Sequence, residues 1–321
     1  MSILLLKLSY MNKKYLIIEI ILFILLLISG TLIFILIKLN KNKVDNDTSN
    51  VVTNESDTSE SNKLSTTEEP NDVVHLVFIH HSTGENWLSD DNGGLGIALS
   101  ENNYFVSDTN YGWGSDSIGD TTDIGNWWLW FRSTNSNIYL DELYNENNQY
   151  STYTRLEDMP SGENEIIMFK SCFPNSALKG DIDDSIPDIE SNPLKGEASG
   201  SDYHTVSNAK GIYIDVLKYF ETRQDKLFIV ITAPPLSDST YADNARSLNN
   251  WLARDWLSDY DYKNVAVFDF FDILGGKDNT LDFPTSSGDD HPSKEGNLKA
   301  TEEFIPFLNN AYNIWENIQN D

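Results

Sequence analysis

Cysteine and basic residues are scarce in this chain of 321 residues. The 1 cysteine, Cys172, excludes an intrachain disulfide and any zinc or iron–sulfur site built on several thiolates. Lys and Arg number 22 against 50 Asp and Glu, which gives a formal net charge of −28 at pH 7. A surface this negative repels phosphate backbones, so nucleic acid is not an expected partner.

A long apolar run lies near the start of the chain. Residues 1–14 form a basic lead, and residues 15–39 are almost wholly apolar, with no charge between Ile20 and Ile37. At a rise of about 1.5 Å per residue, such a run is long enough to cross a bilayer as a helix. No small-residue cleavage site follows it, so we expect an uncleaved, single-pass anchor in the cell membrane. We expect the large domain to lie outside the cell, because a single N-terminal anchor commonly serves export.

Polar residues then dominate as far as residue 72. Residues 40–72 are rich in Asp, Asn, Ser, Thr and Glu and contain few large apolar side chains. Such a composition buries too little apolar surface to offset the entropy lost on ordering, which predicts a disordered linker.

Residues 73–321 alternate between short apolar runs and amphipathic stretches. Strands are predicted at residues 73–79, 103–107, 166–172, 227–232 and 264–268. Long helices are predicted at residues 207–223, 242–257 and 294–318. This alternation, without repeats or an internal linker, predicts one α/β domain: a three-layer α/β/α sandwich around a mostly parallel sheet.

The first predicted strand ends abruptly in polar residues. The apolar run Val73–Ile79 is followed by residues 80–84, which read HHSTG. In open α/β sheets the ligand crevice lies beyond the carboxyl ends of the strands, so Ser82 is a candidate nucleophile. The alternative is that Ser82 caps the next helix. The two roles are compatible, because a serine at a helix N-terminus can present both its hydroxyl and its N–H to the crevice.

Three later segments also place polar residues at or near predicted strand ends or before the last helix. They are residues 110–114 (NYGWG), 169–175 (FKSCFPN) and 289–296 (DDHPSKEG). Together with residues 78–84 (FIHHSTG), they resemble in order and spacing the four sequence blocks of the SGNH (GDSL-like) hydrolase family. The resemblance covers residues 73–318. It implies a flavodoxin-like sheet, ester hydrolysis, and no metal or organic cofactor.

The resemblance also implies a role for each block. Ser82 would be the nucleophile, and His291 the general base that takes its proton. The oxyanion hole would combine the backbone N–H of Ser82, a glycine N–H and the side-chain amide of Asn175. That glycine would be Gly112 or Gly114.

The sequence departs from the family pattern at several positions. His81 stands where the family usually has Asp, and the third block lacks its usual Gly and trailing Asp. The triad carboxylate normally lies three residues before the histidine, where this chain has Gly288. Asp289 or Asp290 would therefore orient His291, unless the serine and histidine work as a dyad; we favour Asp289.

Other side chains near these blocks are candidates for contacts with a substrate. His81 and Trp113 are expected to line the crevice. Trp127, Trp128 and Trp130 would either stack on sugar rings or pack in the core. His80 and His81 are adjacent on an extended segment and point to opposite faces, so we do not expect them to bind a metal together.

The sequence therefore predicts a membrane-anchored serine esterase. It would hydrolyse small acyl esters, such as O-acetyl groups on carbohydrate, through an acyl-enzyme on Ser82. Transfer of the acyl group to a glycan hydroxyl would use the same nucleophile and oxyanion hole. A catalytically inactive glycan-binding module is the alternative from another class.

Overall fold

The computed structural model describes residues 66–157 and 159–319. The predicted basic lead, the predicted membrane helix and most of the predicted linker lie outside these residues. In the part of the chain that the structure describes, no helix is both long enough and apolar enough to cross a membrane.

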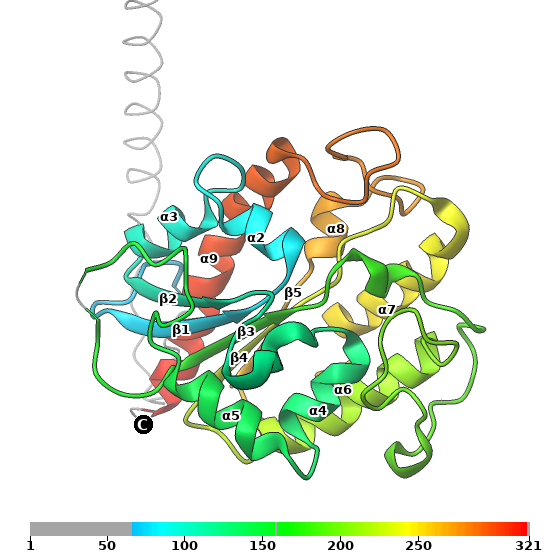
Figure 1. The fold of residues 1–321 in the computed structure, drawn as a ribbon, viewed down its shortest axis with the longest axis horizontal. Coiled ribbons are helices and arrows are strands. Elements are labelled where there is room, and N and C mark those ends of the chain that lie inside the picture. The colour runs from blue at the N-terminus through cyan, green and yellow to red at the C-terminus, as the bar shows by residue number, and fades with distance from the viewer. Residues whose placement is uncertain (1–65, 158, 320–321) are drawn as a thin grey trace, which may run out of the picture. The chain divides into compact units, whose positions relative to one another are not determined.

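Five parallel strands form the centre of the described domain (Figure 1). They are β1 (Val74–Ile79), β2 (Tyr104–Thr109), β3 (Ile166–Lys170), β4 (Leu227–Ile231) and β5 (Val265–Phe268). Their order is β2-β1-β3-β4-β5, and each neighbouring pair is parallel. The predicted α/β class and parallel sheet are confirmed, and the strand order is the flavodoxin-like one. This order switches direction between β1 and β3, so a crevice is expected where these two strands end.

Helices cover both faces of the sheet. One face packs against α2 (Ser82–Leu88), α3 (Leu95–Glu101), α8 (Phe270–Leu274) and α9 (Lys294–Gln319). The other face packs against α4 (Ile124–Phe131), α5 (Ser136–Asn145), α6 (Val206–Phe220) and α7 (Ala242–Arg254). The two helical layers enclose every strand, which is why the strands are nearly continuously apolar.

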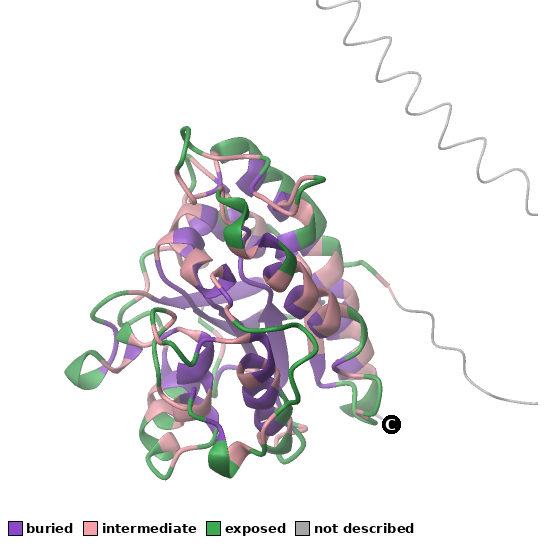
Figure 2. Cartoon of the chain, turned by 90° about the vertical axis from the view of Figure 1, so that its right-hand side faces the viewer, coloured by how far each residue is buried: buried purple, intermediate pink, exposed green. Residues whose placement is uncertain are grey.

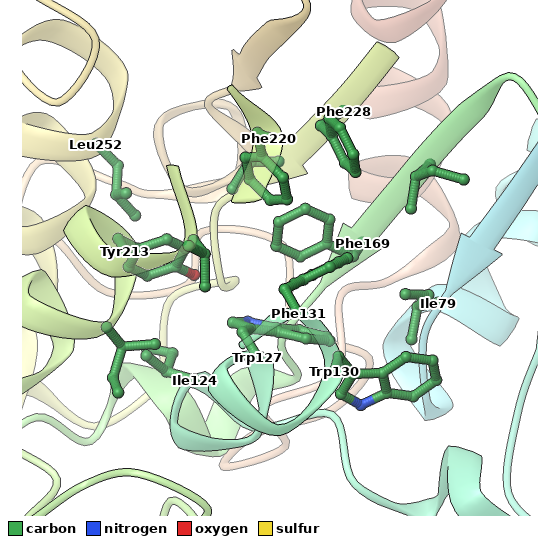
Figure 3. Close-up of a cluster of buried hydrophobic side chains, with 14 of the residues drawn as sticks. Ile79, Ile124, Trp127, Trp130, Phe131, Phe169, Tyr213, Phe220, Phe228 and Leu252 are labelled. Atoms are coloured by element: carbon green, nitrogen blue, oxygen red, sulfur yellow. The ribbon is translucent and has the colours of Figure 1, made fainter. Parts of the chain in front are cut away.

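Alternate residues along each strand enter two separate cores. In β1, Val77 and Ile79 join the core beneath α4 and α6, while Leu76 and Phe78 join the core beneath α2 and α9. Figure 3 shows the first core, in which aromatic side chains of α4 and α6 meet the sheet. The strands lie in the buried centre of Figure 2, with exposed residues confined to loops and outer helix faces.

The segment before β1 belongs to the domain. The side-chain amide of Asn309 donates to the Thr67 carbonyl at 2.9 Å. The amide of Asn103 donates to the Pro70 carbonyl at 2.8 Å. Residues 66–72, which the composition places in the linker, are therefore held against α9 and the start of β2. The predicted linker extends into these residues because composition does not reveal contacts with amides that are distant in sequence.

Candidate active site

The HHSTG sequence makes a tight turn from β1 into α2. His81 is the extended residue before the helix, and Ser82 is its first residue. The turn requires Gly84, because a Cβ there would lie 2.3 Å from the Cβ of His80. The N–H of Ser82 has no acceptor within the helix, as at any helix start. Ser82 thus presents a hydroxyl and a backbone donor at the carboxyl end of β1.

Ser82, His291 and Asp289 come together at this point. The Ser82 Oγ lies 3.1 Å from His291 Nε2, and His291 Nδ1 lies 2.9 Å from Asp289 Oδ1. The side chains of His291 and Asp289 are 31% and 33% exposed. The backbone N–H of His291 also donates to Asp289, and together with the ring it lowers the pKa of that carboxyl. The arrangement has the hydrogen-bond order of a serine–histidine–carboxylate triad.

Asp290, the alternative carboxylate, points elsewhere. It accepts hydrogen bonds from the backbone N–H and hydroxyl of Ser237, at 2.7 and 2.6 Å. It therefore ties the His291 loop to the loop after β4 rather than contacting the imidazole. On the opposite side, the Phe173 ring packs edge-on against His291 with centroids 4.8 Å apart. The imidazole is thus held between Phe173, Asp289 and Ser82.

Asn175 does not have a free donor for an oxyanion. Its Nδ2 donates to Asp123 Oδ1 at 2.6 Å and to the Cys172 carbonyl at 3.3 Å. Its Oδ1 accepts the backbone N–H of Ile124 at 2.9 Å. Asn175 is fully buried in the 3-10 turn after β3, and it fixes the start of α4. The expected oxyanion role is corrected here because Asp123 and the Cys172 carbonyl take both amide hydrogens.

The glycines of the second block serve the loop that carries them. The Gly112 N–H donates to the carboxylate of Asp120, so this N–H is not available to an oxyanion. Gly114 adopts a φ of 76° directly before the 3-10 helix Ser115–Asp120, and a Cβ there would lie 2.9 Å from Ile118. Both glycines meet backbone requirements of this turn. The Ser82 N–H, at the first residue of α2, is next to the Tyr111 hydroxyl rather than to a backbone carbonyl of its own helix.

Trp113, Trp127 and Trp130 lie in the core. Trp113 is 1% exposed and stacks on Trp130 with centroids 5.7 Å apart. Trp127 is fully buried, and its Nε1 donates to Ser171 at 3.0 Å. Trp113 is therefore corrected from a substrate contact to a core residue. The sequence alone does not distinguish a substrate contact from a core position, because aromatic residues after a strand occur in both.

His81 lies beneath an exposed tyrosine. Its Nε2 donates to the Gly119 carbonyl at 3.0 Å, and its ring stacks on Tyr111 with centroids 4.0 Å apart. Burial lowers the pKa of His81, which keeps the ring neutral near pH 7. Burial also raises the pKa of Tyr111, while the hydroxyl and N–H of Ser82 act in the opposite direction. Tyr111, 62% exposed, therefore presents a neutral phenol beside Ser82, with His81 as its support.

Three further residues lie under Ser82. Cys172 Sγ is 3.5 Å from Ser82 Oγ and 3.4 Å from Thr83 Oγ1. The buried ammonium of Lys170, the last residue of β3, donates to the Thr83 hydroxyl. The sequence assigned no role to Lys170 or Thr83. The available signal was a lysine ending a wholly apolar strand, since a fully buried lysine is rare without a specific reason.

The residues described contain no group of three or more His, Cys, Asp or Glu side chains placed to hold a metal ion. The aspartates of the acidic loop at 181–184 bind their own backbone instead, with Asp184 accepting from the Asp181 N–H at 3.1 Å.

Comparisons with known proteins give remote likenesses. No protein-family model and no curated protein matches the chain. It is similar to a structure described as an acylhydrolase from Bacteroides fragilis, at 12% identity and TM-score 0.43, over 75% of this chain and 91% of that one. It is also similar to a carbohydrate esterase, at 14% identity and TM-score 0.37, over 77% of this chain and 68% of that one. Likenesses at these TM-scores carry no argument about function, which depends on the site geometry.

Proposed function

We propose that the chain is a serine esterase of the SGNH type, which hydrolyses small acyl esters through an acyl-enzyme on Ser82. The observation that carries this proposal is the continuous contact from Ser82 Oγ to His291 Nε2, at 3.1 Å, and from His291 Nδ1 to Asp289, at 2.9 Å. Both distances lie in the range in which protons are transferred between side chains. A module that only binds glycans would not need this order of groups.

The mechanism follows from which atoms can give or take a proton. Ser82 Oγ attacks the ester carbonyl while His291 Nε2 takes its proton, and the adjacent Asp289 carboxylate stabilises the imidazolium. The Ser82 N–H donates to the oxyanion of the tetrahedral intermediate. His291 then returns the proton to the departing alcohol, leaving the acyl group on Ser82. Water, deprotonated by His291, hydrolyses this acyl-enzyme and restores the hydroxyl.

The surroundings of Ser82 favour a neutral ester of a polar alcohol. The negative net charge of the chain opposes polyanionic substrates. The exposed ring of Tyr111 offers a flat apolar surface beside the nucleophile, which suits the face of a sugar ring. We therefore propose O-acetylated carbohydrate as the substrate class, with the acetyl group at Ser82 and the sugar against Tyr111.

We propose, in addition, that residues 15–39 anchor the domain in the cell membrane with the catalytic part outside. The support is the charge-free apolar run between Ile20 and Ile37. Protease added to intact cells should then release the domain from the cell surface. A domain that stays protected until the cells are lysed would contradict this orientation.

The catalytic proposal is tested by labelling the full chain with a fluorophosphonate probe and measuring hydrolysis of 4-nitrophenyl acetate. Wild type should incorporate one probe molecule on Ser82 and turn over the ester. Ser82→Ala should lose labelling and at least about 10³-fold in kcat. Ser286→Ala, a serine in the exposed loop before Asp289, is the matched control and should behave as wild type. Unchanged turnover in Ser82→Ala would refute the proposal.

Hydrolysis and transfer are separated by the products. With acetylated xylan as substrate, free acetate should form at the same rate with or without an added unacetylated glycan. Acetate release that falls as the added glycan becomes acetylated would identify a transferase instead.

A further inference from the structure

A buried lysine without a carboxylate partner ends β3 directly beneath the nucleophile. Lys170 is fully buried, and its Nζ contacts the Thr83 hydroxyl and the Ser171 carbonyl, the latter at 3.3 Å. The Phe270 ring covers it, with its centroid 5.9 Å from Nζ. Among the described residues no Asp or Glu forms an ion pair with Lys170.

Lys170 differs in this respect from a second buried lysine of the domain. Lys226, the other buried lysine, lies just before β4 at the opposite end of the sheet and pairs with Glu163 at 3.0 Å. Burying an ammonium without a counter-charge costs free energy that a paired lysine recovers in part. A fold with no use for the Lys170 charge would be more stable with an apolar residue there. The placement of Lys170 next to Ser82 suggests what the charge is used for.

The hydrogen bonds from Lys170 to His291 can be ordered from donor to acceptor. An ammonium can only donate, so the Thr83 oxygen accepts from Lys170 and its own hydrogen is free to point to Cys172 Sγ. When Ser82 gives its proton to His291 Nε2, its oxygen is left to accept, and both the Cys172 thiol and the Tyr111 hydroxyl are next to it. The Cys172 thiol is the neighbour that continues to Thr83. All donors in the chain then point in one direction, from the buried ammonium to the imidazole.

We propose that Lys170 is a positioning residue for the nucleophile. Through Thr83 and Cys172 it holds the Ser82 hydroxyl with its proton directed at His291. Its positive charge also stabilises the negative charge that develops on the oxyanion. This inference rests on the esterase function proposed above. Lys170 would thereby supply stabilisation that the Asn175 amide does not, because this amide donates to Asp123 rather than to the crevice.

The titration of Lys170 provides a distinctive signature. Burial lowers the pKa of Lys170 to about 8, while the charge of Cys172 acts in the opposite direction. The lysine is therefore charged below that pH and neutral above it, so activity should fall as the pH rises through about 8. Two other titratable groups face it. The pKa of His81 is lowered by burial, so His81 is already neutral in this range. Burial raises the pKa of Cys172, but Lys170 and neighbouring hydroxyls outweigh it and lower the pKa, so Cys172 requires its own control.

The main experiment compares Lys170→Met with Lys226→Met in the full chain. The readouts are kcat and KM for 4-nitrophenyl acetate and the rate of fluorophosphonate labelling of Ser82, each between pH 6 and 10. Lys170→Met should lose about 10- to 100-fold in kcat and labelling rate, less than removal of a direct oxyanion donor. Its KM should stay nearly constant, and the decline above pH 8 should disappear. Lys226→Met should keep the wild-type rate and pH profile.

Conservative variants separate positioning from folding. Thr83→Ser keeps the hydroxyl and should retain wild-type labelling, whereas Thr83→Val should resemble Lys170→Met while remaining folded by circular dichroism. Cys172→Ser keeps a hydrogen-bonding group that does not titrate, so the decline above pH 8 should persist in it. The persistence would assign that decline to Lys170 rather than to the thiol.

Two results would overturn the inference. One is a Lys170→Met protein that labels at the wild-type rate with the wild-type alkaline decline. The other is a folded Thr83→Val protein as reactive as Thr83→Ser, which decides the matter even if Lys170→Met fails to fold. Failure of the esterase proposal is distinguishable, because wild type itself would then neither label at Ser82 nor hydrolyse the ester.

Discussion

Two histidine–aspartate pairs lie within this domain, and their surroundings differ. His291 and Asp289 are joined by a 2.9 Å contact on a loop, with each side chain about one-third exposed. His80 and Asp108 are joined by a 3.3 Å contact between the ends of β1 and β2, where both are buried. The two pairs use the same chemical groups, so their different roles must come from what lies on the far side of each imidazole.

The second ring nitrogen decides what each histidine can do. In His291 it faces the Ser82 hydroxyl, a group that can give up a proton. In His80 it faces the carbonyl oxygen of His81 at 3.0 Å, a group that can only accept. Both nitrogens of His80 therefore face acceptors, and the ring connects Asp108 to the backbone at His81. His80 fastens the backbone next to Ser82, whereas His291 can move a proton.

Replacing His291 should have the largest effect on activity and little effect on stability. In His291→Gln the base is lost, and kcat should fall by at least about 10³-fold. The ring is about one-third exposed and lies on a loop outside the two cores, so the urea midpoint should stay close to that of wild type. If His291→Gln kept activity within tenfold of wild type, His291 would not be the proton-transferring member of the two histidine–aspartate pairs.

Replacing Asp108 should have a large effect on stability, in contrast to the replacement of His291. In Asp108→Asn the amide oxygen can still accept the backbone N–H groups of Thr152 and Tyr153, but the buried oxygen that faces His80 Nε2 is replaced by an NH₂ group, which cannot accept. Asp108→Asn should lower the free energy of unfolding by about 3–5 kcal/mol, as for other broken buried pairs. Urea unfolding measures this, with His291→Gln as the comparison.

The stability from Asp108 should also depend on pH. Burial raises the pKa of Asp108, but His80 and neighbouring donors outweigh it, so the folded pKa is below the ordinary value. A lowered pKa means that the stabilisation is complete above the unfolded pKa of about 3.9 and is lost as the pH falls through the folded value. The difference between wild type and Asp108→Asn should therefore shrink below about pH 4. A difference that stays constant down to pH 2 would contradict the lowered pKa of Asp108.

The last prediction compares the effects on kcat of replacing the neighbouring residues Asp289 and Asp290. Asp289→Asn should lower kcat by less than His291→Gln does, and by at most about 10⁴-fold, because the imidazolium loses its carboxylate. Asp290→Asn should change kcat by less than about threefold, because Asp290 contacts Ser237 and not the imidazole. Equal losses in the two variants would mean that the His291 loop as a whole, rather than Asp289, orients the ring.

The sequence predicted the fold because its signals are local. Four of the five strands are mainly apolar runs, and the three long helices carry an apolar stripe, so periodicity located them within a few residues. The strand β2 was placed at 103–107 and extends to Thr109, because its last residues, Ser107 to Thr109, are polar but buried. The prediction relied on apolar residues, so it could not extend the strand over polar residues that are buried.

The site was predictable only in part, for a related reason. Ser82 and His291 follow distinctive local sequences, whereas the choice between Asp289 and Asp290 depends on side-chain direction, which spacing does not specify. The engagement of Asn175 by Asp123 depends on a contact between residues 52 positions apart. Lys170 is visible in the sequence, but its significance depends on the absence of a carboxylate around it in three dimensions.

The loop that carries His291 is closed at its base. The backbone N–H of Thr285 donates to the His291 carbonyl at 3.0 Å, and that of Ser293 donates to the Phe283 carbonyl at 2.6 Å. Asp289 binds both the ring and the backbone N–H of His291, so the carboxylate and the imidazole are held on one loop. The separation of this loop from the start of α2 sets the distance between His291 Nε2 and Ser82 Oγ. A displacement of the loop would carry Asp289 and His291 away from Ser82 together.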